Sequence, residues 1–429
     1  MPEKTALVLG ASGLIGKACV SALAEAGFSV TGVSRTRPKS VVCNWVQADL
    51  TRLDPKDFHD LLADTEVVVN AAGALQDGAE DSLEAIHVGM IQNLVTTLEG
   101  RATRVVQISA AGVSEDADTA FFETKARGDA HLMQHHKSWV VLRPALVIGA
   151  EAYGGTALLR AYAGFPGVEW RLFDGVTIQT VALTDLANAV VLAATGQIAE
   201  GTLADLAEEE ARSFLDVSRQ IRDWQGFSGK RLPLSLSRWV LRLTGRAADG
   251  LGWLGWRSPL RSTALSVMQS GIAADRHSWR LAGGPPMMAL EETLSKLPAH
   301  SQERWFARMY LLLPLSIAVL ALFWIASGVI GVLQFTQAAD ILTSRGMGFE
   351  LASLLVLGGA VVDVALGMLI LIRRRARLAA LGMLAVSIVY LLGSAILAPA
   401  LWLDPLGPMV KVLPGMIAAL IPVLFLEDR

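Results

Sequence analysis

The spacing of apolar and polar positions divides the chain into two parts. Up to about residue 300 the sequence has the pattern of a soluble protein, and it opens with an apolar run, a glycine-punctuated turn and an amphipathic stretch. From Met309 onward, long stretches carry no charged residue. The pattern predicts an α/β domain over residues 1–300 and an all-α membrane domain over residues 301–429.

The first segment, TALVLGASGLIGKACVSALAEAGFSVTGVSR, predicts a β–α–β unit with Gly27 as the helix stop. Gly10, Gly13 and Gly16 have the spacing G-x-x-G-x-x-G. The first permits a tight turn, the second lets the backbone approach a pyrophosphate, and the third allows close helix–strand packing. Free N–H groups of the helix N-terminus would bind the phosphates. The expected cofactor contacts in this turn are Gly10, Ser12, Gly13, Leu14, Ile15 and Gly16.

The end of the second predicted strand indicates which cofactor is bound. A site for NAD places Asp or Glu there to hold the ribose 2′-OH. This chain instead has Ser34, Arg35, Thr36 and Arg37, which can neutralise a 2′-phosphate. We therefore expect NADP(H), with NADPH favoured over NADH and with Ser34 and Arg35 as contacts. The alternative is a solvated basic turn.

Composition and charge narrow the class of protein. With 429 residues and 52 % hydrophobic content, the chain is long enough for two or three domains and too apolar for one soluble globule. Net charge is −3, and no Lys/Arg-rich run precedes the apolar segments, so no nucleic-acid partner is expected. Cys19 and Cys43 lack metal-ligand spacing and are typical of core residues in a reducing compartment. No metal site is predicted.

The last part of the chain predicts four membrane-spanning helices, each long enough to cross about 30 Å of hydrocarbon. The predicted spans are Met309–Leu333, Leu351–Ile372, Leu378–Leu403 and Leu406–Leu426. The run RRRAR, Arg373–Arg377, separates the second span from the third, and the positive-inside rule places it in the cytoplasm. We expect an inner-membrane protein with both the N-terminal domain and the C-terminus cytoplasmic, and we expect no signal peptide before MPEKTALVLG.

One charged residue, Asp363, lies within the second predicted span. A charge at this depth is costly unless it is paired or faces a cavity, so it marks a candidate functional site. The alternatives are a structural link between helices, with Lys411 as a partner, or a protonated carboxyl.

Further segments of the N-terminal part follow in a characteristic order: QADL (47–50), VVVNAAGA (67–74), RVVQISAAGV (104–113), LRPALVIG (142–149) and TVALTDLANAV (180–190). Together they resemble the extended and atypical short-chain dehydrogenase/reductases over roughly residues 4–300. The resemblance implies a Rossmann fold, that is, a doubly wound parallel sheet, with a small substrate subdomain at about 195–300. It also implies a set of cofactor contacts: Asp49 and Leu50 at the adenine, and Ala71, Ala72 and Gly73 toward the nicotinamide. Asp185 is expected to be a helix N-cap.

The active members of this family use a Ser or Thr, a Tyr and a Lys, and this chain departs from that set. The segment AFFETKARGDAHL has Phe121 at the Tyr position and Lys125 at the Lys position. The Ser/Thr position is Ala110, with Ser109 one residue earlier. Because Phe has no ionisable proton, the family's general-acid step cannot use residue 121. Lys125 can still bind ribose hydroxyls, and Ser109 is kept as a cofactor contact.

Two other residues are candidates for the missing proton donor. His87 lies where many extended members have an Asn near the nicotinamide, and an imidazole titrates near neutral pH. The alternative is a partly buried histidine that binds the backbone. Tyr153 is a second candidate, for which a place in the pocket wall is the simpler interpretation.

The region 195–300 predicts an amphipathic helix and then a segment that alternates Arg with Trp and Leu. Core aromatics of the substrate subdomain and a surface at the bilayer interface both fit this pattern. Beyond it, FWIASGVIG, GGAVVDVALGMLIL and LDPLGPMVKVLPG resemble the DoxX-like four-helix membrane family over about residues 303–427. Some members of that wider group are associated with quinone-linked oxidation of sulfur compounds.

These features predict a membrane-anchored oxidoreductase that transfers hydride from NADPH to a lipid-soluble acceptor such as a quinone. The alternative is a non-catalytic NADP(H)-binding redox sensor or assembly subunit, which would explain the loss of Tyr and Ser directly. A third option, isomerisation or reduction of a sugar nucleotide, is disfavoured by the missing Tyr.

Overall fold

The computed structural model describes residues 4–37, 43–78, 81–173, 175–256, 258, 260–272, 274–397, 399–405 and 407–426. The chain forms two compact units. The N-terminal unit comprises Met1–Asp249 and Ser258–Ala307, and the C-terminal unit comprises Gly250–Arg257 and Arg308–Arg429. The segment 250–257, which the sequence analysis included in the N-terminal domain, thus packs with the helical unit. The C-terminal residues 427–429, expected in the cytoplasm, lie outside the described residues.

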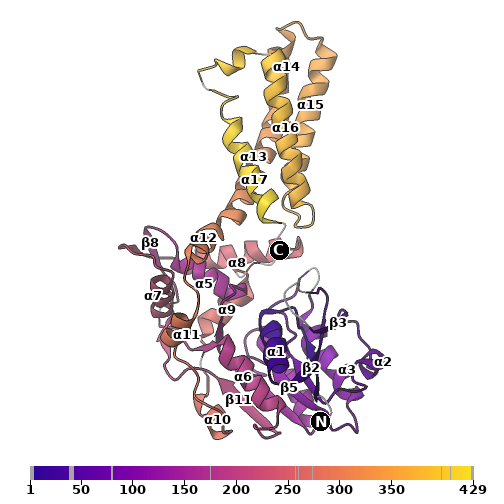
Figure 1. Cartoon of the computed structure of the whole chain (residues 1–429). Coiled ribbons are helices and arrows are strands. Elements are labelled where there is room, and N and C mark those ends of the chain that lie inside the picture. Colours follow the sequence, from indigo (N-terminus) through magenta and orange to yellow (C-terminus); the bar gives the residue numbers. More distant parts are fainter. Residues whose placement is uncertain are drawn as a thin grey trace. The chain divides into compact units, whose positions relative to one another are not determined.

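The N-terminal unit is built on a seven-stranded sheet in the order β11-β6-β5-β4-β1-β2-β3 (Figure 1). All neighbouring strands are parallel. The strands are β1 (Lys4–Leu9), β2 (Phe28–Ser34), β3 (Asn44–Gln47), β4 (Val67–Asn70), β5 (Arg104–Ile108), β6 (Trp139–Pro144) and β11 (Thr202–Leu206). This arrangement confirms the doubly wound Rossmann fold that the sequence predicted.

Helices cover both faces of the sheet, so its strands are apolar almost throughout. On one face, α1 (Leu14–Glu25) and α6 (Leu183–Ala194) pack on Val8 and its neighbours. On the other, α2 (Pro55–Leu61), α3 (Met90–Thr97) and α4 (Ala120–His135) pack on Leu7 and Leu9. Both faces are therefore closed to water, which leaves the carboxyl edge of the sheet for binding.

The strand order reverses between β1 and β4. In open α/β sheets, ligands bind at the carboxyl ends of the strands where this reversal occurs. Here the N–H of Ala71, just after β4, donates to the carbonyl of Leu9 at the end of β1, at 3.0 Å. The glycine turn after β1 and the segment after β4 thus lie side by side at the place where a dinucleotide is expected.

The rest of the N-terminal unit consists of short strands and helices, of which the helices that end at Trp253 and Met309 have their last residues in the C-terminal unit. They are η1 (Ala85–Gly89), β7 (Leu146–Ile148), α5 (Gly154–Ala163), β8 (Val168–Arg171), β9 (Thr177–Ile178), β10 (Thr180–Ala182), β12 (Arg212–Ser213), α7 (Phe214–Trp224), β13 (Leu232–Ser235), α8 (Arg238–Trp253), α9 (Ser262–Ser270), α10 (Arg276–Leu281), α11 (Leu290–Lys296) and α12 (Ser301–Met309). The amphipathic helix predicted near residue 214 is α7, and the side chain of Ser213 caps its N-terminus.

Asp185 is not the N-cap that the sequence predicted. Helix α6 begins at Leu183, and its N-cap is Ala182, so Asp185 lies in the first helical turn. A carboxylate is favourable there because of the helix dipole. Its Oδ2 accepts a hydrogen bond of 2.6 Å from the N–H of Met288, a tertiary contact that a local pattern could not reveal.

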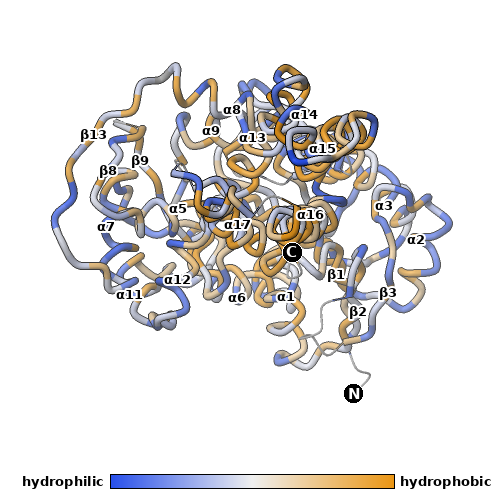
Figure 2. The backbone as a smooth tube through the Cα atoms, turned by 90° about the horizontal axis from the view of Figure 1, so that it is seen from above, coloured by the Kyte–Doolittle hydropathy of each residue, from blue (hydrophilic) through white to orange (hydrophobic). Residues whose placement is uncertain are grey.

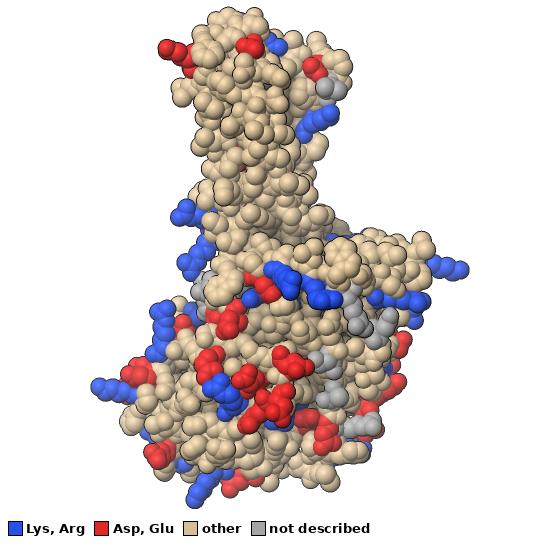
Figure 3. Space-filling view, turned by 180° about the vertical axis from the view of Figure 1, so that it is seen from behind, with Lys and Arg blue, Asp and Glu red and all other residues tan. Residues whose placement is uncertain are grey.

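The C-terminal unit is a bundle in which α15 and α17 each pack against both α13 and α16. Its helices are α13 (Leu312–Leu333), α14 (Phe335–Thr343), α15 (Phe349–Leu369), α16 (Ala376–Leu397) and α17 (Val412–Phe425), with a 3₁₀ turn η2 (Pro399–Trp402). Figure 2 shows the apolar character of the four bundle helices, and Figure 3 shows charged side chains gathered near the ends of the unit. The predicted four-helix bundle is confirmed as an architecture.

The fourth predicted span is shorter than expected. Among the described residues, three helical segments are long and apolar enough to cross a membrane: Ser301–Leu333, α15 and α16. Helix α17 has 14 residues and rises only about 21 Å. Gly407, with a φ of 57°, and Pro408 precede it in a non-helical segment and delay its start. The short helix α14 was not predicted.

Within the C-terminal unit, the segment 250–257 is held to the arginine-rich turn after α15. The indole N–H of Trp256 donates to the carbonyl of Leu371 at 2.6 Å. The guanidinium of Arg373 lies 5.6 Å from the centre of the Trp256 ring, and its backbone N–H donates to the carbonyl of Leu254 at 3.0 Å. Part of the Trp/Arg segment is therefore a packing element of the membrane unit.

Candidate cofactor and active site

The glycine turn after β1 has the close backbone contacts that its sequence predicted. Gly10 has a φ of +75°, and a Cβ there would lie 2.7 Å from the backbone of Ala72. A Cβ on Gly16 would lie 2.2 Å from the carbonyl oxygen of Gly10. Gly13 differs, because the nearest atom to a Cβ there is the same oxygen at 3.3 Å. The first and third glycines thus leave no room for a Cβ, whereas at the second a Cβ would make one tight contact with a backbone oxygen.

The N-terminus of α1 has the properties of an anion site. Gly13 is its N-cap, no side chain caps it, and the first turn contains no acidic residue. Ser12, Leu14 and Ile15 are half-buried around it. The first N–H groups of a helix lack partners within the helix and carry partial positive charge. The turn can therefore receive a pyrophosphate, as expected from its sequence.

Ser34 ends β2 and Arg35 follows it, where the sequence predicts the adenosine side of the site. Ser34 is 5 % exposed, and its hydroxyl donates to the carbonyl of Thr36 at 2.8 Å. The guanidinium of Arg35 binds the carboxylate of Asp81 at 2.9 Å, a residue far along the chain. A 2′-phosphate bound by Arg35 would therefore compete with Asp81.

Asp49 and Leu50 follow β3 at the predicted adenine position. Oδ1 of Asp49 accepts hydrogen bonds from the N–H and the hydroxyl of Thr51, at 3.1 and 2.7 Å. Burial disfavours ionisation of Asp49, but these hydrogen bonds and the charges of Arg35 and Arg52 outweigh it and lower its pKa. An ionised carboxylate is suited to accept from an adenine amino group. Leu50 is buried at 6 % exposure.

Gly73 lies between the two candidate catalytic residues. A Cβ on Gly73 would lie 3.4 Å from Nε2 of His87 and 3.7 Å from Nζ of Lys125. The segment Ala71–Gly73 is held by Asn70, whose Oδ1 accepts from the N–H of Ala72 at 3.1 Å. The structure thus brings together Gly73, His87 and Lys125, which the sequence analysis assigned to the nicotinamide end.

His87 is buried and both of its ring nitrogens are engaged. Nε2 accepts from the N–H of Ala74 at 3.3 Å, so Nδ1 carries the proton and donates to the Thr124 hydroxyl at 2.9 Å. Burial and the charge of Lys125 lower the pKa of His87 to about 3. The ring is therefore neutral near pH 7. It lies in η1, a π-helical turn, a feature common near functional sites.

Lys125 is buried at 7 % exposure, and its Nζ donates to the carbonyl of Ile108 at 3.1 Å. Burial lowers its pKa, while the charge of Asp129 opposes that shift. The ring of Phe121 lies one turn earlier on α4, with its centre 5.9 Å from Nζ. An apolar ring thus occupies the place of the family's phenol. Tyr153, the other candidate phenol, is 60 % exposed at the start of α5.

Sequence reasoning missed a buried polar network under this site. Asp129 is fully buried and accepts from Ser109 Oγ at 2.5 Å and from Gln107 Nε2 at 3.3 Å. Gln107 in turn accepts from Asn70 at 2.8 Å. Burial raises the pKa of Asp129, opposed by Lys125, Ser109 and other partners. The sequence contains a signal for this network, because Asp129 follows Lys125 by one helical turn and therefore lies on the same face of α4.

Ser109, expected as a cofactor contact, is thus engaged by Asp129 and is only 5 % exposed. Ala110, at the family's Ser/Thr position, is half-buried and packs near Val113 and Phe122. No hydroxyl therefore stands at position 110 to polarise a carbonyl. The roles of Ser109, Lys125 and His87 in chemistry remain predictions.

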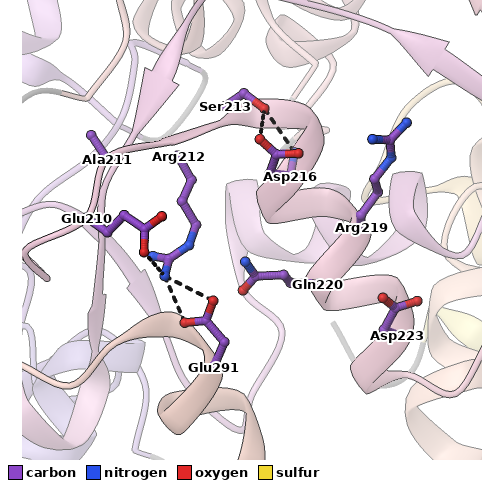
Figure 4. A pocket seen from close by; sticks show the side chains of 9 residues that line it. All are labelled: Glu210, Ala211, Arg212, Ser213, Asp216, Arg219, Gln220, Asp223 and Glu291. Atoms are coloured by element: carbon purple, nitrogen blue, oxygen red, sulfur yellow. Dashed lines mark hydrogen bonds and ion pairs between the residues drawn. The ribbon is translucent and has the colours of Figure 1, made fainter.

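A pocket of about 350 Å³ lies elsewhere in the N-terminal unit (Figure 4). It is lined by α7, β12 and α11 and shares no residue with the cofactor contacts. Arg212 is held there by Glu210 and Glu291, both at 2.8 Å. These carboxylates neutralise it, so the pocket is a structural ion-pair cluster to which we assign no ligand. Among the residues that the structure describes, no group of three His, Cys, Asp or Glu side chains is placed to hold a metal ion.

Comparisons with known proteins agree with this geometry. Residues 10–166 match the NAD(P)H-binding family, and residues 321–420 match the DoxX-like family. The chain thus joins an NAD(P)-binding domain with a Rossmann fold to a C-terminal DoxX-like membrane domain. Both resemblances seen in the sequence are confirmed.

Solved structures share the fold of the N-terminal unit. The Bordetella bronchiseptica enzyme WbmH in complex with NAD+ has a TM-score of 0.53 and 16 % identity, covering 70 % of this chain and 99 % of its own. MoeE5 in complex with UDP-glucose and NAD has a TM-score of 0.52 and 19 % identity, covering 72 % and 99 %. At these identities the similarity shows the fold alone.

One curated relative is a subunit of a mitochondrial enzyme. The chain is 26 % identical over 154 residues to the mitochondrial NADH dehydrogenase [ubiquinone] 1 alpha subcomplex subunit 9 of Dictyostelium discoideum. The match covers 34 % of this chain and 43 % of the relative, so the chain spans less than half the length of that protein.

Proposed function

We propose that the protein is an NADPH-dependent reductase of a lipid-soluble acceptor of the quinone type. The NAD(P)-binding domain would hold a cofactor that supplies a hydride. The DoxX-like domain would keep the protein in the membrane, where such an acceptor is dissolved. The observation that carries the proposal is the apolar ring of Phe121 beside Lys125, at the place where the family has its proton donor.

The absence of a phenol at position 121 restricts which acceptors the protein can reduce. Hydride addition to an ordinary carbonyl leaves an alkoxide, which needs a proton from a positioned acid. Neither Phe121 nor the neutral His87 is a strong acid in this site. Hydride addition to a quinone leaves a hydroquinone anion, a phenolate whose parent acid resembles Tyr, with a pKa of about 10. This anion can take its proton from water, so quinone, hydride and one proton give hydroquinone without a catalytic phenol.

The chain's own residues would then bind the cofactor and orient it. The turn at Gly13 would receive the pyrophosphate, and Lys125 would donate to the ribose hydroxyls near the nicotinamide. His87 would be a positioning residue, because its hydrogen bonds to Ala74 and Thr124 fix the segment after β4 against α4.

The test is turnover by the full chain in lipid. NADPH oxidation should occur with lipid-soluble quinones and not with aldehyde or ketone substrates. Gly13→Asp should abolish it, because a carboxylate would occupy the phosphate position, while Gly13→Ala should retain part of it. Equal turnover of simple carbonyls would contradict the proposal.

The cofactor preference is tested by calorimetry. If Ser34 and Arg35 bind the 2′-phosphate, NADPH should bind more tightly than NADH by about 1.5–3 kcal/mol, the range for hydrogen bonds to charged groups. Arg35→Asp should move the preference toward NADH. Equal affinities of the two cofactors for the unaltered protein would refute this assignment.

A second candidate is a non-catalytic NADP(H)-binding sensor or assembly subunit. Two observations favour it: the similarity to a subunit of NADH dehydrogenase, and a site in which the nearest imidazole is neutral and the phenol is absent. In that case NADPH should bind and Lys125→Ala should weaken binding, yet no acceptor should oxidise the bound cofactor.

A further inference from the structure

Three polar side chains meet inside the C-terminal unit: Asp363 of α15, Ser327 of α13 and Tyr390 of α16. The Ser327 hydroxyl donates to Oδ2 of Asp363 at 2.8 Å, and the Tyr390 hydroxyl donates to Oδ1 at 3.1 Å. Asp363 is 6 % exposed, whereas Tyr390 is 40 % exposed and Ser327 is also exposed. The carboxyl is therefore covered by two residues that themselves reach the outer surface of the helices.

Glycines on the same helices make this meeting possible. A Cβ on Gly359, one turn before Asp363, would lie 3.0 Å from the Tyr390 hydroxyl. A Cβ on Gly328, next to Ser327, would lie 2.5 Å from the carbonyl oxygen of Ala360. Small residues let membrane helices approach at backbone distance. The packing of α15 thus brings both hydroxyls to one carboxyl.

No charged side chain stands level with Asp363 on the helices packed against α15. Helix α13 contains no charged residue. Helix α14, the short helix that follows α13, contains Asp340, and α16 contains Arg377 as well as the titratable Tyr390. Arg377 lies about 20 Å from Tyr390 along its helix, and Glu350 lies about 20 Å from Asp363 along α15. The link to Lys411 considered from the sequence is replaced by the two hydroxyl contacts.

Hydroxyl partners suit a carboxyl that changes its protonation state. A hydroxyl can donate or accept. An ionised Asp363 accepts from both Ser327 and Tyr390, whereas a protonated Asp363 donates to one hydroxyl and accepts from the other. A fixed cation would instead require the ionised form. The polar group is thus hydrogen-bonded in both states, in a region where an unsatisfied polar group is costly.

We propose that Asp363, Ser327 and Tyr390 form a proton-binding site in the membrane domain, at which Asp363 takes up and releases a proton. This site goes beyond the proposed reductase activity and does not depend on the bound cofactor.

The test uses dicyclohexylcarbodiimide, a lipid-soluble reagent that reacts with protonated carboxyl groups. The full chain in phosphatidylcholine nanodiscs is treated from about pH 5 to about pH 9, the span in which buried carboxyls are known to titrate. The adduct at each acidic residue is then measured by peptide mass spectrometry. Asp363 should be modified at low pH and progressively less as pH rises.

Variants separate proton exchange from a structural role. Asp363→Asn should lose this adduct and Asp363→Glu should retain one, while Glu350→Gln, a control on the same helix, should leave it unchanged. Ser327→Ala and Tyr390→Phe remove donors to the carboxylate, so the midpoint of labelling should move to higher pH. These two single changes leave Asp363 in place, so they test the site even if Asp363→Asn does not fold.

Three results would overturn the proposal. Absence of the adduct at every pH would mean that Asp363 does not carry an accessible proton. A yield that does not change with pH would mean that its proton is fixed. Protection by sodium chloride but not by choline chloride at equal ionic strength would identify a sodium site instead.

Discussion

The rings of His87 and Phe121 meet edge to face, with centroids 5.7 Å apart and an angle of 71° between their planes. The contact joins η1 to the first turn of α4, close to Nζ of Lys125. Aromatic pairs of this geometry contribute about 0.5–1.5 kcal/mol beyond the area they bury. Phe121 therefore packs against the histidine as well as replacing a phenol.

Restoring the phenol gives the first prediction. In Phe121→Tyr, the positive charge of Lys125 should favour the ionised form of the new phenol. The pKa of this phenol should therefore fall below the usual value of about 10. Spectroscopic titration of tyrosinate, taken as the difference from the unaltered protein, measures this shift. Lys125→Ala in the same background should bring the value back up.

The double variant with Ala110→Ser tests whether the rest of the pocket is intact. Reduction of simple carbonyls should appear only when both groups are present. A new phenol that titrates at its ordinary pKa would show that residue 121 does not face Lys125 in solution.

The buried imidazole predicts a specific dependence of stability on pH. The pKa of His87 falls from 6.5 to about 3 on folding, so between these values the unfolded chain binds more protons than the folded chain. The unaltered protein should therefore lose stability relative to His87→Gln as pH drops through this window. The slope should be at most about 1.36 kcal/mol per pH unit.

The measurement is the difference in unfolding free energy between the two proteins at several pH values, which cancels other titrating groups. Above pH 6.5 the difference should be constant. A difference that stays constant between about pH 4 and about pH 7 would contradict the expected slope. It would mean that His87 is not buried as a neutral ring.

Replacing Asp129 should lower the stability of the protein. Asp129→Asn keeps the shape of the side chain but leaves Lys125 and Arg143, whose guanidinium lies 3.8 Å from the carboxylate, without their buried anion. Removing one partner of a buried pair costs about 3–5 kcal/mol. Chemical unfolding of the full chain measures it. Ser109→Ala, which removes one hydrogen bond to the same carboxylate, should cost only about 1 kcal/mol, and equal losses in both variants would contradict the charge argument.

The sequence predicted those parts of the fold whose causes are local. The glycine turn and β2 follow from steric limits within a few residues, and the structure confirms them through the close approach of Gly16 to Gly10. The pairing of Arg35 with Asp81 and the contact of Asp185 with Met288 join distant segments. No local pattern specifies such contacts.

The same limit applies to the candidate site. Lys125 and His87 were found by their positions in family motifs, but the neutral state of His87 depends on its burial and its contacts with the segment after β4 and with α4. In the membrane unit, apolar content marked the fourth span, yet Gly407 and Pro408 shortened its helix. Apolar content alone does not report where backbone geometry ends a helix.

The three glycines of the turn should respond differently to substitution. Gly16→Ala and Gly10→Ala should unfold the turn, because each Cβ would lie within 3 Å of backbone atoms. In Gly13→Ala the Cβ would lie 3.3 Å from the carbonyl oxygen of Gly10, a contact that a small shift relieves, so this variant should lose much less stability than the other two and mainly weaken cofactor binding. Thermal unfolding and calorimetry separate the two effects. If Gly16→Ala kept its stability and NADPH affinity, the turn would not have the backbone contacts described above.

The last prediction concerns the side of the membrane on which the arginine-rich turn lies. Helix α15 rises about 31 Å, so the residues before and after it should be on opposite sides. Ser344 and Arg374 are both exposed, and each can be replaced by Cys. Ala376 is unsuitable because it is fully buried.

The background for labelling needs one change. Cys19 is buried, and burial raises the pKa of its thiol to about 12, so it should stay unreactive. Cys43 is partly exposed and is replaced by Ser.

With an impermeant thiol reagent on intact cells, Ser344→Cys should react from outside and Arg374→Cys only after permeabilisation, because the positive residues favour the cytoplasmic side. The reverse pattern would invert the orientation. Reaction of both from outside would show that α15 does not cross the membrane, since no other described helix of spanning length lies between the two positions.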